Sequence, residues 1–495
     1  MAAPTSPRRR WDSDIPAVFR PLVRAYLFGY ASAVGPRLLA LLLQHAARYR
    51  RSKQQQPGPA PDRRPDEPFL AGLRRILSGP LSCRSFPASC AVLIGGATFL
   101  ERRLLKLPVK SLLDRYGWTV SEVARRRLSR WLASFIAAWL SLRLLQSKPS
   151  PGFSDVEPGP RGSRQTVRYA GRTLDLTFFA VTRALDVVVG ELWRRCRARR
   201  QAAGQWTRLD RAVSRMADPA LFALSSGLVM WTWFYRPWRL QRAYNKWIAS
   251  AAAVDGRLIT ALQRCRDGAL VYGRDTGQAP LLGSMCADYG WPAEWGDPVR
   301  SVPFPCEMVH MGCGPSCEYH ALSRFARSFA WAMTTYLPLT LLLAARGRGR
   351  GRGGAAGALR RAVASASRSS AFLAAFVALF YYGVCLARTR LGPRALGRDA
   401  AACQRIDGGL CVGAGCLLCG WSILLESAAR RKDVALFVAP RAMAALFPRR
   451  YPADRQWRET AAFAAAAAVV MAAFAENPAS VRGVAGGVLA WVFQE

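Results

Sequence analysis

Long apolar runs alternate along the sequence with arginine-rich connectors, and this alternation restricts the possible folds more than any other feature. A transmembrane helix needs about 20 mostly apolar residues to cross the hydrocarbon core of a bilayer. A soluble helix instead carries charged residues along its exposed face. Because 51% hydrophobic residues are segregated from the charges that give a net charge of +40, the chain is predicted to be an all-α, polytopic transmembrane helical bundle.

About eight to ten runs reach the length of a span. We predict spans at 22–43, 86–104, 129–145, 173–191, 218–236, 325–345, 370–388, 408–426, 461–475 and 481–494. The shorter run 433–447 contains Pro440 and Arg441, which favours an interfacial or re-entrant segment over a span.

Composition also divides the chain into regions. These are a basic N-terminal tail at 1–20, a first membrane region at 21–191, a central region at 192–345, an Arg/Gly-rich linker at 346–368 and a second membrane region at 369–495. Disorder is predicted at 51–68 and 147–165, because segments poor in apolar residues cannot offset the entropy of ordering. The similar glycine-bearing runs 91–105 and 409–428 suggest two related membrane halves.

Basic residues flank the apolar runs, as at 102–106, 125–127, 194–200 and 430–432. Nucleic-acid binding, contact with anionic lipid headgroups and membrane topology would each explain a basic excess. The position of the charges beside apolar runs favours the last two. We therefore expect the bilayer, anionic headgroups, and a homo-oligomer or other organelle membrane proteins as partners, and no nucleic acid. The 13 cysteines are an odd number, which argues against a secreted disulfide framework.

Small residues recur four positions apart inside the predicted spans. The pairs are Gly29 with Ala33, Ala91 with Gly95, Gly409 with Gly413, and Gly483 with Gly487. Small residues let helix backbones approach closely in lipid. Chance in an Ala/Gly-rich chain could produce any one pair, but four pairs together favour a tightly packed bundle.

The predicted span 173–191 carries Asp175, Arg183 and Asp186. A charge inside the hydrocarbon is costly and often marks a conduction or proton path. The two aspartates are eleven positions apart, which places them on nearly the same helix face, and Arg183 can pair with Asp186. Structural ion pairing, or a helix lying at the interface, would explain the same charges.

The densest chemistry lies between residues 305 and 320, where the sequence reads PCEMVHMGCGPSCEYH. This block contains two of the three histidines, and its candidate ligands are Cys306, His310, Cys313, Cys317 and His320. Thiolates and imidazoles are the ligands that Zn²⁺ prefers, although this spacing is not a standard one. A metal site, a disulfide or redox pair, and a loop without such chemistry remain open. Because no HExxH, GxSxG or Walker A pattern occurs in the sequence, we do not expect an enzyme.

Several blocks resemble fungal relatives of transmembrane protein 135, in the Cys-rich N-terminal region of that family. They are FYRPWRLQRAYNKWI (234–248), PCEMVH and SCEYH (305–320), TTYLPLTLLL (334–343), and the glycine-bearing runs at 27–43 and 90–105. The first block also has the aromatic and arginine residues of an interfacial anchor. The resemblance makes Cys306, His310, Ser316 and Cys317 the motif positions, whereas Cys313 is additional. That family is distantly similar to the mitochondrial translocase and peroxisomal membrane protein superfamily.

The resemblance implies a non-enzymatic, multi-pass protein of a mitochondrial or peroxisomal membrane, with a role in membrane dynamics or lipid homeostasis. One alternative is a transporter or channel with Asp175 and Asp186 along its path. Another is a membrane-bound redox or metal-dependent enzyme centred on residues 306–320. No cofactor is certain from the sequence, and zinc at the Cys/His loop is the one that its residues suggest.

Overall fold

The computed structural model describes residues 11–12, 14–54, 69–106, 121–158, 164–346 and 355–494. Most of the predicted loop 51–68 and the Arg-Gly run of the predicted linker lie outside these residues. The chain forms two compact units, one made of Met1–Arg199 together with Arg450–Glu495, and the other of Arg200–Arg449. The first unit therefore combines segments from both ends of the sequence.

The helices of the first unit are α1 (Arg20–Gln54), α2 (Phe69–Ser78), α3 (Phe86–Lys106), α5 (Glu122–Gln146), α6 (Leu174–Ala202, whose last residues enter the second unit), α18 (Gln456–Glu476) and α19 (Gly483–Val492). Helices α3, α5 and α18 pack through alanines, among them Ala97, Ala138 and Ala464. Gly29 and Gly95 lie at close contacts of α1 with α3, as predicted. An added Cβ would lie 2.9 Å from the Pro87 Cα atom at Gly29 and 2.5 Å from the Leu22 side chain at Gly95.

A small antiparallel sheet ties the two chain segments of this unit together. Its strands, in the order β1-β2-β3, are β1 (Ser154–Pro158), β2 (Arg164–Ala170) and β3 (Tyr451–Pro452). The connector 147–165, predicted to be disordered, thus contains strand β1. Pairing with β2 satisfies the backbone hydrogen bonds of β1, and Asp155 forms an ion pair with Arg450 at 2.7 Å. Both partners lie outside β1, so its local composition could not indicate them.

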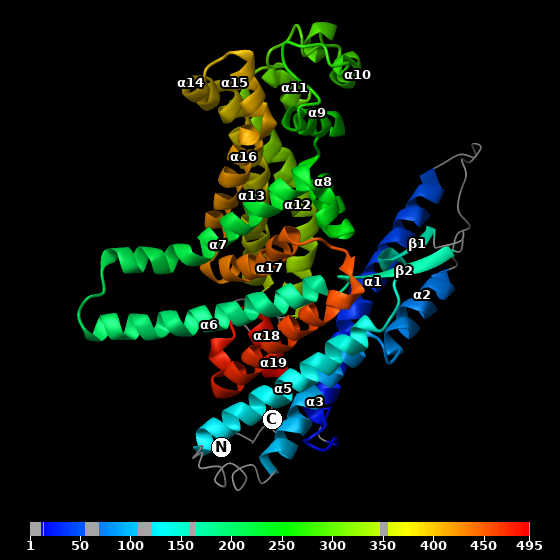
Figure 1. Cartoon of the computed structure of the whole chain (residues 1–495), viewed down its shortest axis with the longest axis vertical. Helices are drawn as coiled ribbons and strands as arrows, with labels where there is room; N and C mark the ends of the chain where they lie inside the picture. The colour runs from blue at the N-terminus through cyan, green and yellow to red at the C-terminus, as the bar shows by residue number, and fades with distance from the viewer. Residues whose placement is uncertain are drawn as a thin grey trace. The chain divides into compact units, whose positions relative to one another are not determined.

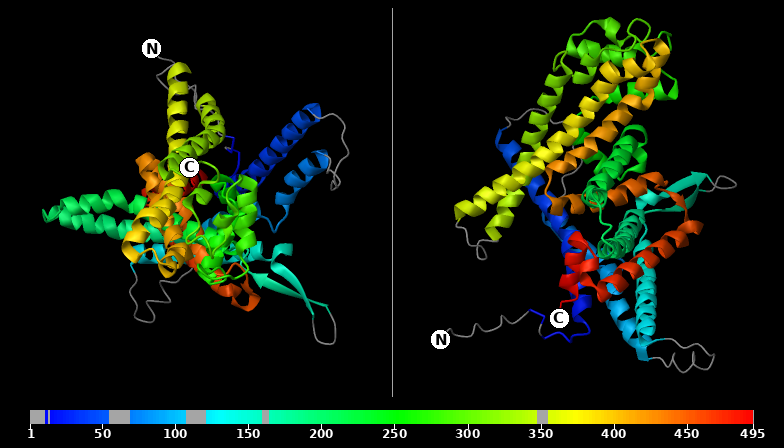
Figure 2. Two further views of the ribbon diagram at one scale, coloured as in Figure 1. Left: turned by 90° about the horizontal axis from the view of Figure 1, so that it is seen from above. Right: turned by 90° about the vertical axis from the view of Figure 1, so that its left-hand side faces the viewer.

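The described residues of the second unit form helices and connecting loops, with no strand among them. Its helices are α7 (Arg208–Tyr235), α8 (Arg242–Ala252), α9 (Gly256–Asp267), α10 (Ala279–Tyr289), α11 (Cys306–His310), α12 (Cys317–Arg346), α13 (Ala355–Leu386), α14 (Gly392–Leu396), α15 (Ala400–Arg405), α16 (Cys411–Cys419) and α17 (Ala428–Leu446). Helices α12 and α13 lie side by side in both views (Figures 1 and 2). Residues 355–368 of the predicted linker belong to α13. Single π-helical turns occupy Ala387–Leu391 and Ile406–Leu410.

Seven helical segments in the described part of the chain are long and apolar enough to cross a membrane. They are Arg20–Leu42, Phe69–Lys106, Glu122–Gln146, Cys317–Ala345, Ala356–Leu396, Ala400–Leu425 and Ala453–Glu476. The prediction of an all-α bundle with membrane-spanning helices is confirmed, and the chain is an integral membrane protein. The predicted spans 173–191 and 218–236 are helical in α6 and α7 but are not among the seven, because charges in α6 and polar aromatic residues in α7 lower their hydropathy. Helix α19 has only ten residues.

The contact between α13 and α16 leads to a stability prediction. A Cβ added at Gly415 would lie 2.7 Å from the Phe380 carbonyl oxygen, whereas one added at Gly413 of the same helix would lie 3.7 Å from the Trp231 ring. Gly415→Ala should therefore destabilise the protein by about 1–3 kcal/mol through overpacking. Gly413→Ala should leave stability unchanged or raise it by up to about 1 kcal/mol, because alanine favours the helix. Thermal unfolding in detergent compares the two; equal melting temperatures would contradict the close contact.

Candidate metal centre

Three cysteines and one histidine converge in the second unit. Cys306 and His310 lie on α11, Cys317 begins α12 and Cys385 lies near the end of α13. Their ligand atoms all lie within 4.8 Å of one another, and His310 and Cys385 are buried. We call these four residues the Cys/His centre. It could hold a metal ion.

The spacing of the donor atoms matches the edges of a tetrahedron around a metal ion. With Zn–S bonds of about 2.3 Å and a Zn–N bond of about 2.05 Å, tetrahedral edges are about 3.8 Å between two sulfurs and about 3.6 Å between sulfur and nitrogen. The two Sγ atoms of Cys306 and Cys317 are 3.9 Å apart. His310 Nε2 lies 3.6 Å from the Cys306 Sγ and 3.5 Å from the Cys385 Sγ. Three of the distances between ligand atoms therefore match the edges of a tetrahedral zinc site.

Local backbone geometry explains how one short block supplies three of the four ligands. Cys306 and His310 are four residues apart in α11, so they lie on the same helix face. The chain then reverses through Met311, Gly312 and Gly314, which all have positive φ values between 50° and 88°. The two glycines adopt this conformation without a steric penalty. The reversal places Cys317 in the first turn of α12.

The imidazole of His310 is held in the orientation that a metal ligand needs. Its Nδ1–H donates to the Gly314 carbonyl oxygen at 2.7 Å, which leaves Nε2 facing the cysteine sulfurs. Such a hydrogen bond from the second ring nitrogen fixes the tautomer of metal-bound histidines. On one face, the ring stacks on His320 with a centroid distance of 4.6 Å.

The charges of the centre suit metal binding. A hydrogen bond from the Cys385 thiol, helped by that with His310, lowers the pKa of Cys306 to about 4 against the opposing effect of burial. Burial also disfavours a charged His310, but its hydrogen bonds with Cys306 and the Gly314 carbonyl raise its pKa overall. The Cys306 thiol therefore loses its proton more readily than a free cysteine does. Metal binding requires a thiolate and a free imidazole nitrogen, so a bound metal ion would replace the protons on these ligand atoms.

A buried ion pair supports the centre from one side. Arg388 lies one turn after Cys385 and pairs with Asp407 through Nε at 2.7 Å; their side chains are 2% and 1% exposed. Arg388 also donates to the Phe304 carbonyl oxygen at 2.8 Å, two residues before Cys306. The Tyr272 hydroxyl donates to Asp407 at 2.6 Å. Arg388 therefore connects the chain segments that carry Cys306 and Cys385.

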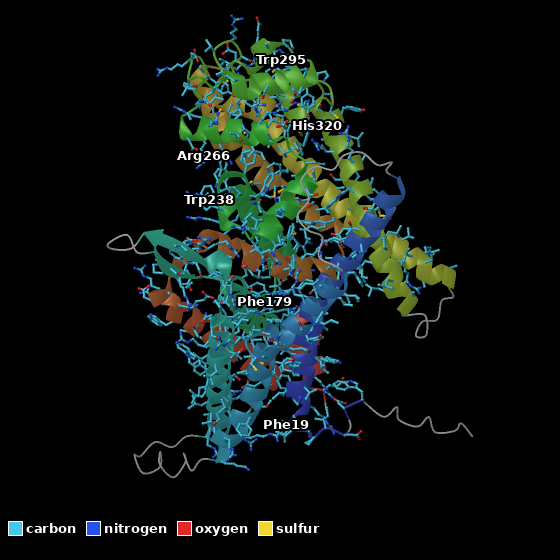
Figure 3. The ribbon with its side chains drawn as sticks, turned by 90° about the vertical axis from the view of Figure 1, so that its right-hand side faces the viewer. Phe19, Phe179, Trp238, Arg266, Trp295 and His320 are labelled. Atoms are coloured by element: carbon cyan, nitrogen blue, oxygen red, sulfur yellow. The ribbon has the colours of Figure 1, made fainter. Side chains whose placement is uncertain are left out.

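The structure brings together three of the five predicted ligand residues. The other two are not in the group: the Cys313 Sγ donates to the Ser323 hydroxyl at 3.2 Å, and the His320 ring packs between His310 and Tyr381. His320 (labelled in Figure 3) is fully buried, and neither ring nitrogen has a hydrogen-bond partner among the described residues. Sequence reasoning missed Cys385, because it treated the apolar run 370–388 only as a span. The signal that it overlooked was a cysteine followed by Arg388 at the end of that run.

The predicted intramembrane charges lie in the first unit. The Asp186 side chain is only 6% exposed and forms an ion pair with Arg482, which precedes α19. Arg183 is buried as well; its guanidinium donates to the Arg482 carbonyl oxygen at 3.2 Å and stacks on Phe179. Asp175 lies in the first turn of α6 and is half-buried. The contacts of Asp186 are those expected of a structural ion pair.

Comparisons with known proteins give no match to any family model, curated protein or solved structure. The resemblance to transmembrane protein 135 therefore stays a prediction. The function has to be argued from the residues and their geometry.

The buried ion pair beside the centre leads to a prediction. Arg388→Met should destabilise the protein by about 3–5 kcal/mol, because it leaves the Asp407 carboxylate buried without its partner. The double variant Arg388→Met/Asp407→Leu, which removes both charges, should regain most of that loss. Thermal unfolding in detergent measures both. A single variant as stable as the original chain would contradict the structural role of the pair.

Proposed function

We propose that this chain is a non-enzymatic, multi-pass membrane protein in which a structural zinc ion closes the Cys/His centre. Three thiols and one imidazole lie at the spacing of a tetrahedral zinc site, and this arrangement supports the proposal most directly. Four protein ligands are typical of structural zinc, whereas catalytic zinc keeps one position for water or substrate. A Cys₃His set also favours zinc over magnesium or calcium, which prefer oxygen ligands.

The zinc ion would act as a cross-link between parts of the second unit. Its ligands come from α11, α12 and α13, and the first and last ligands are far apart in the sequence. Metal binding to preformed ligands stabilises the folded state directly. The short helix α11, with only five residues, gains most from such a cross-link, because a helix of this length is not stable alone.

We further propose that the protein belongs to a mitochondrial or peroxisomal membrane and acts in membrane dynamics or lipid homeostasis. This part is supported by the sequence blocks at 234–248, 305–320 and 334–343 and their resemblance to relatives of transmembrane protein 135. A transport role for Asp175 and Asp186 has no comparable support, since Asp186 is neutralised by Arg482.

The zinc proposal predicts one zinc ion per chain in protein purified without chelators. Cys385→Ser should lower this content by at least half, because only three ligands remain. Cys313→Ser is the matched control, since Cys313 lies in the same loop but outside the centre, and it should keep the zinc. Elemental analysis of both variants measures the content. Zinc that is substoichiometric in the original chain and unchanged by Cys385→Ser would contradict the proposal, as would a disulfide between Cys306 and Cys317 in the purified protein.

The organelle proposal predicts where the full chain accumulates. A fluorescently tagged chain should coincide with mitochondrial or peroxisomal markers and remain in the membrane pellet after alkaline carbonate extraction. Tags at either end serve as controls for each other, because a tag can mask a targeting signal. Accumulation of both tagged forms in the secretory pathway would contradict the organelle assignment. Release by carbonate would contradict membrane integration itself.

A further inference from the structure

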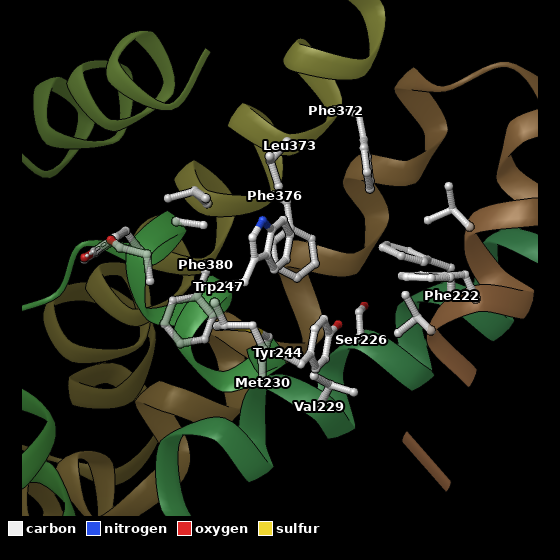
Figure 4. A pocket seen from close by; sticks show the side chains of 18 of the residues that line it. Phe222, Ser226, Val229, Met230, Tyr244, Trp247, Phe372, Leu373, Phe376 and Phe380 are labelled. Atoms are coloured by element: carbon white, nitrogen blue, oxygen red, sulfur yellow. Dashed lines mark hydrogen bonds between the residues drawn. The ribbon is translucent and has the colours of Figure 1, made fainter. Parts of the chain in front are cut away.

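An apolar cavity lies inside the second unit, between helices α7, α8, α13 and α17 (Figure 4). Its volume is about 270 Å³, close to the lower end of the roughly 300–1,000 Å³ of small-molecule sites. Phenylalanines from α7, α13 and α17 form much of the wall, and Ser226 is one of its few polar groups. Water is a poor occupant for such a space, because each buried water needs two to four polar partners.

Helix α8 covers one side of the cavity and has the character of a membrane-interface helix. Tyr244 and Trp247 both line the cavity, and their rings stack with a centroid distance of 6.0 Å. Trp247 is 45% exposed, and Trp238, which is labelled in Figure 3 and lies just before α8, is 70% exposed. Amphipathic tryptophan and tyrosine rings gather at the level of the lipid headgroups. Tyr244 and Trp247 are therefore suited to the level at which a lipid tail meets its headgroup.

A positive charge lies directly behind the cavity wall. The Arg441 guanidinium carbon is 3.7 Å from the Phe437 ring centroid and 5.2 Å from that of Tyr244, and both of these rings line the cavity. The guanidinium also donates to the Phe437 carbonyl oxygen one turn earlier in α17. Arg441 is half-buried, so its charge is screened less than that of an exposed arginine.

We propose that this cavity binds one acyl chain of an anionic amphiphile, with the anionic head beside Arg441. The apolar wall suits a hydrocarbon tail, and the cation suits a carboxylate or phosphate head. A helix of a partner protein, about 10–12 Å across with its side chains, is too wide for this volume. The inference rests on the membrane location under the proposed function and deepens it by naming a ligand class.

A free fatty acid and an anionic phospholipid share this chemistry, and two probes distinguish them. Photoreactive diazirine analogues of palmitate and of phosphatidic acid are added separately to the purified full chain in detergent, and labelled peptides are identified by mass spectrometry. Labelling is expected on α7, α8, α13 or α17. Preferential labelling by one analogue identifies the source of the acyl chain.

Variants of the wall and of the cation test the two parts of the proposal. Ala251→Phe fills the cavity from α8 and should reduce labelling at least tenfold; Val434→Phe does the same from α17 if the first variant fails to fold. Arg441→Gln should reduce labelling by the anionic probes about fivefold, the effect of one basic residue near a lipid headgroup. The same variant should not change labelling by a neutral fatty-alcohol analogue. Arg394→Gln, an exposed arginine of α14 that does not line the cavity, is the matched control.

Unchanged labelling in both filled variants would overturn the cavity as the binding site. Equal loss of anionic and neutral probes in Arg441→Gln would overturn the role of the cation. Zinc content and carbonate extraction are measured on the same preparations. A chain that keeps its zinc and its membrane association but takes up no label contradicts only this inference, whereas loss of membrane association contradicts the proposed function itself.

Discussion

Hydrocarbon cannot hydrogen-bond to a polypeptide backbone, and most of this fold follows from that constraint. Each membrane-spanning segment must satisfy its own N–H and C=O groups, so it is helical. The same constraint applies to side chains, which is why charges in apolar surroundings have partners. In the first unit, Glu459 accepts hydrogen bonds from Thr173 and Tyr451. In the second unit, Arg388 pairs with Asp407 and Glu426 with Arg430. The Cys/His centre is a further polar cluster that a metal ion would neutralise.

The helical class and most spans could be predicted from the sequence, because length and hydropathy are local properties. The same reasoning counted α6 and α7 as membrane spans, although charges and polar aromatic residues make them less apolar than the seven segments. Such a run still forms a helix when neighbouring helices pack against it. The division into two units could not be predicted. Composition treats 369–449 and 450–495 alike, whereas the packing of α18 on α5 and the pairing of β3 with β2 place the second stretch with residues 1–199.

The candidate site shows the same limit at the level of single residues. Cys306, His310 and Cys317 are close in sequence, so their spacing drew attention to them. Cys385 comes from a distant apolar helix and joins them only because α12 and α13 pack side by side. Cys313 and His320 have the same chemical groups as the ligands, but the turn through Gly312 and Gly314 directs them elsewhere. Residue type and spacing therefore identified the region, and only the three-dimensional packing selected the ligands.

The interrupted first unit has a consequence for biosynthesis. A ribosome completes the whole second unit, with all four residues of the Cys/His centre, before it begins residues 450–495. Until those residues emerge, β2 lacks its β3 neighbour and α5 lacks α18, so the first unit remains incomplete, with a polar strand edge and a helix face uncovered. A premature stop after Arg449 would consequently keep all four candidate metal ligands and yet leave the first unit without part of its packing.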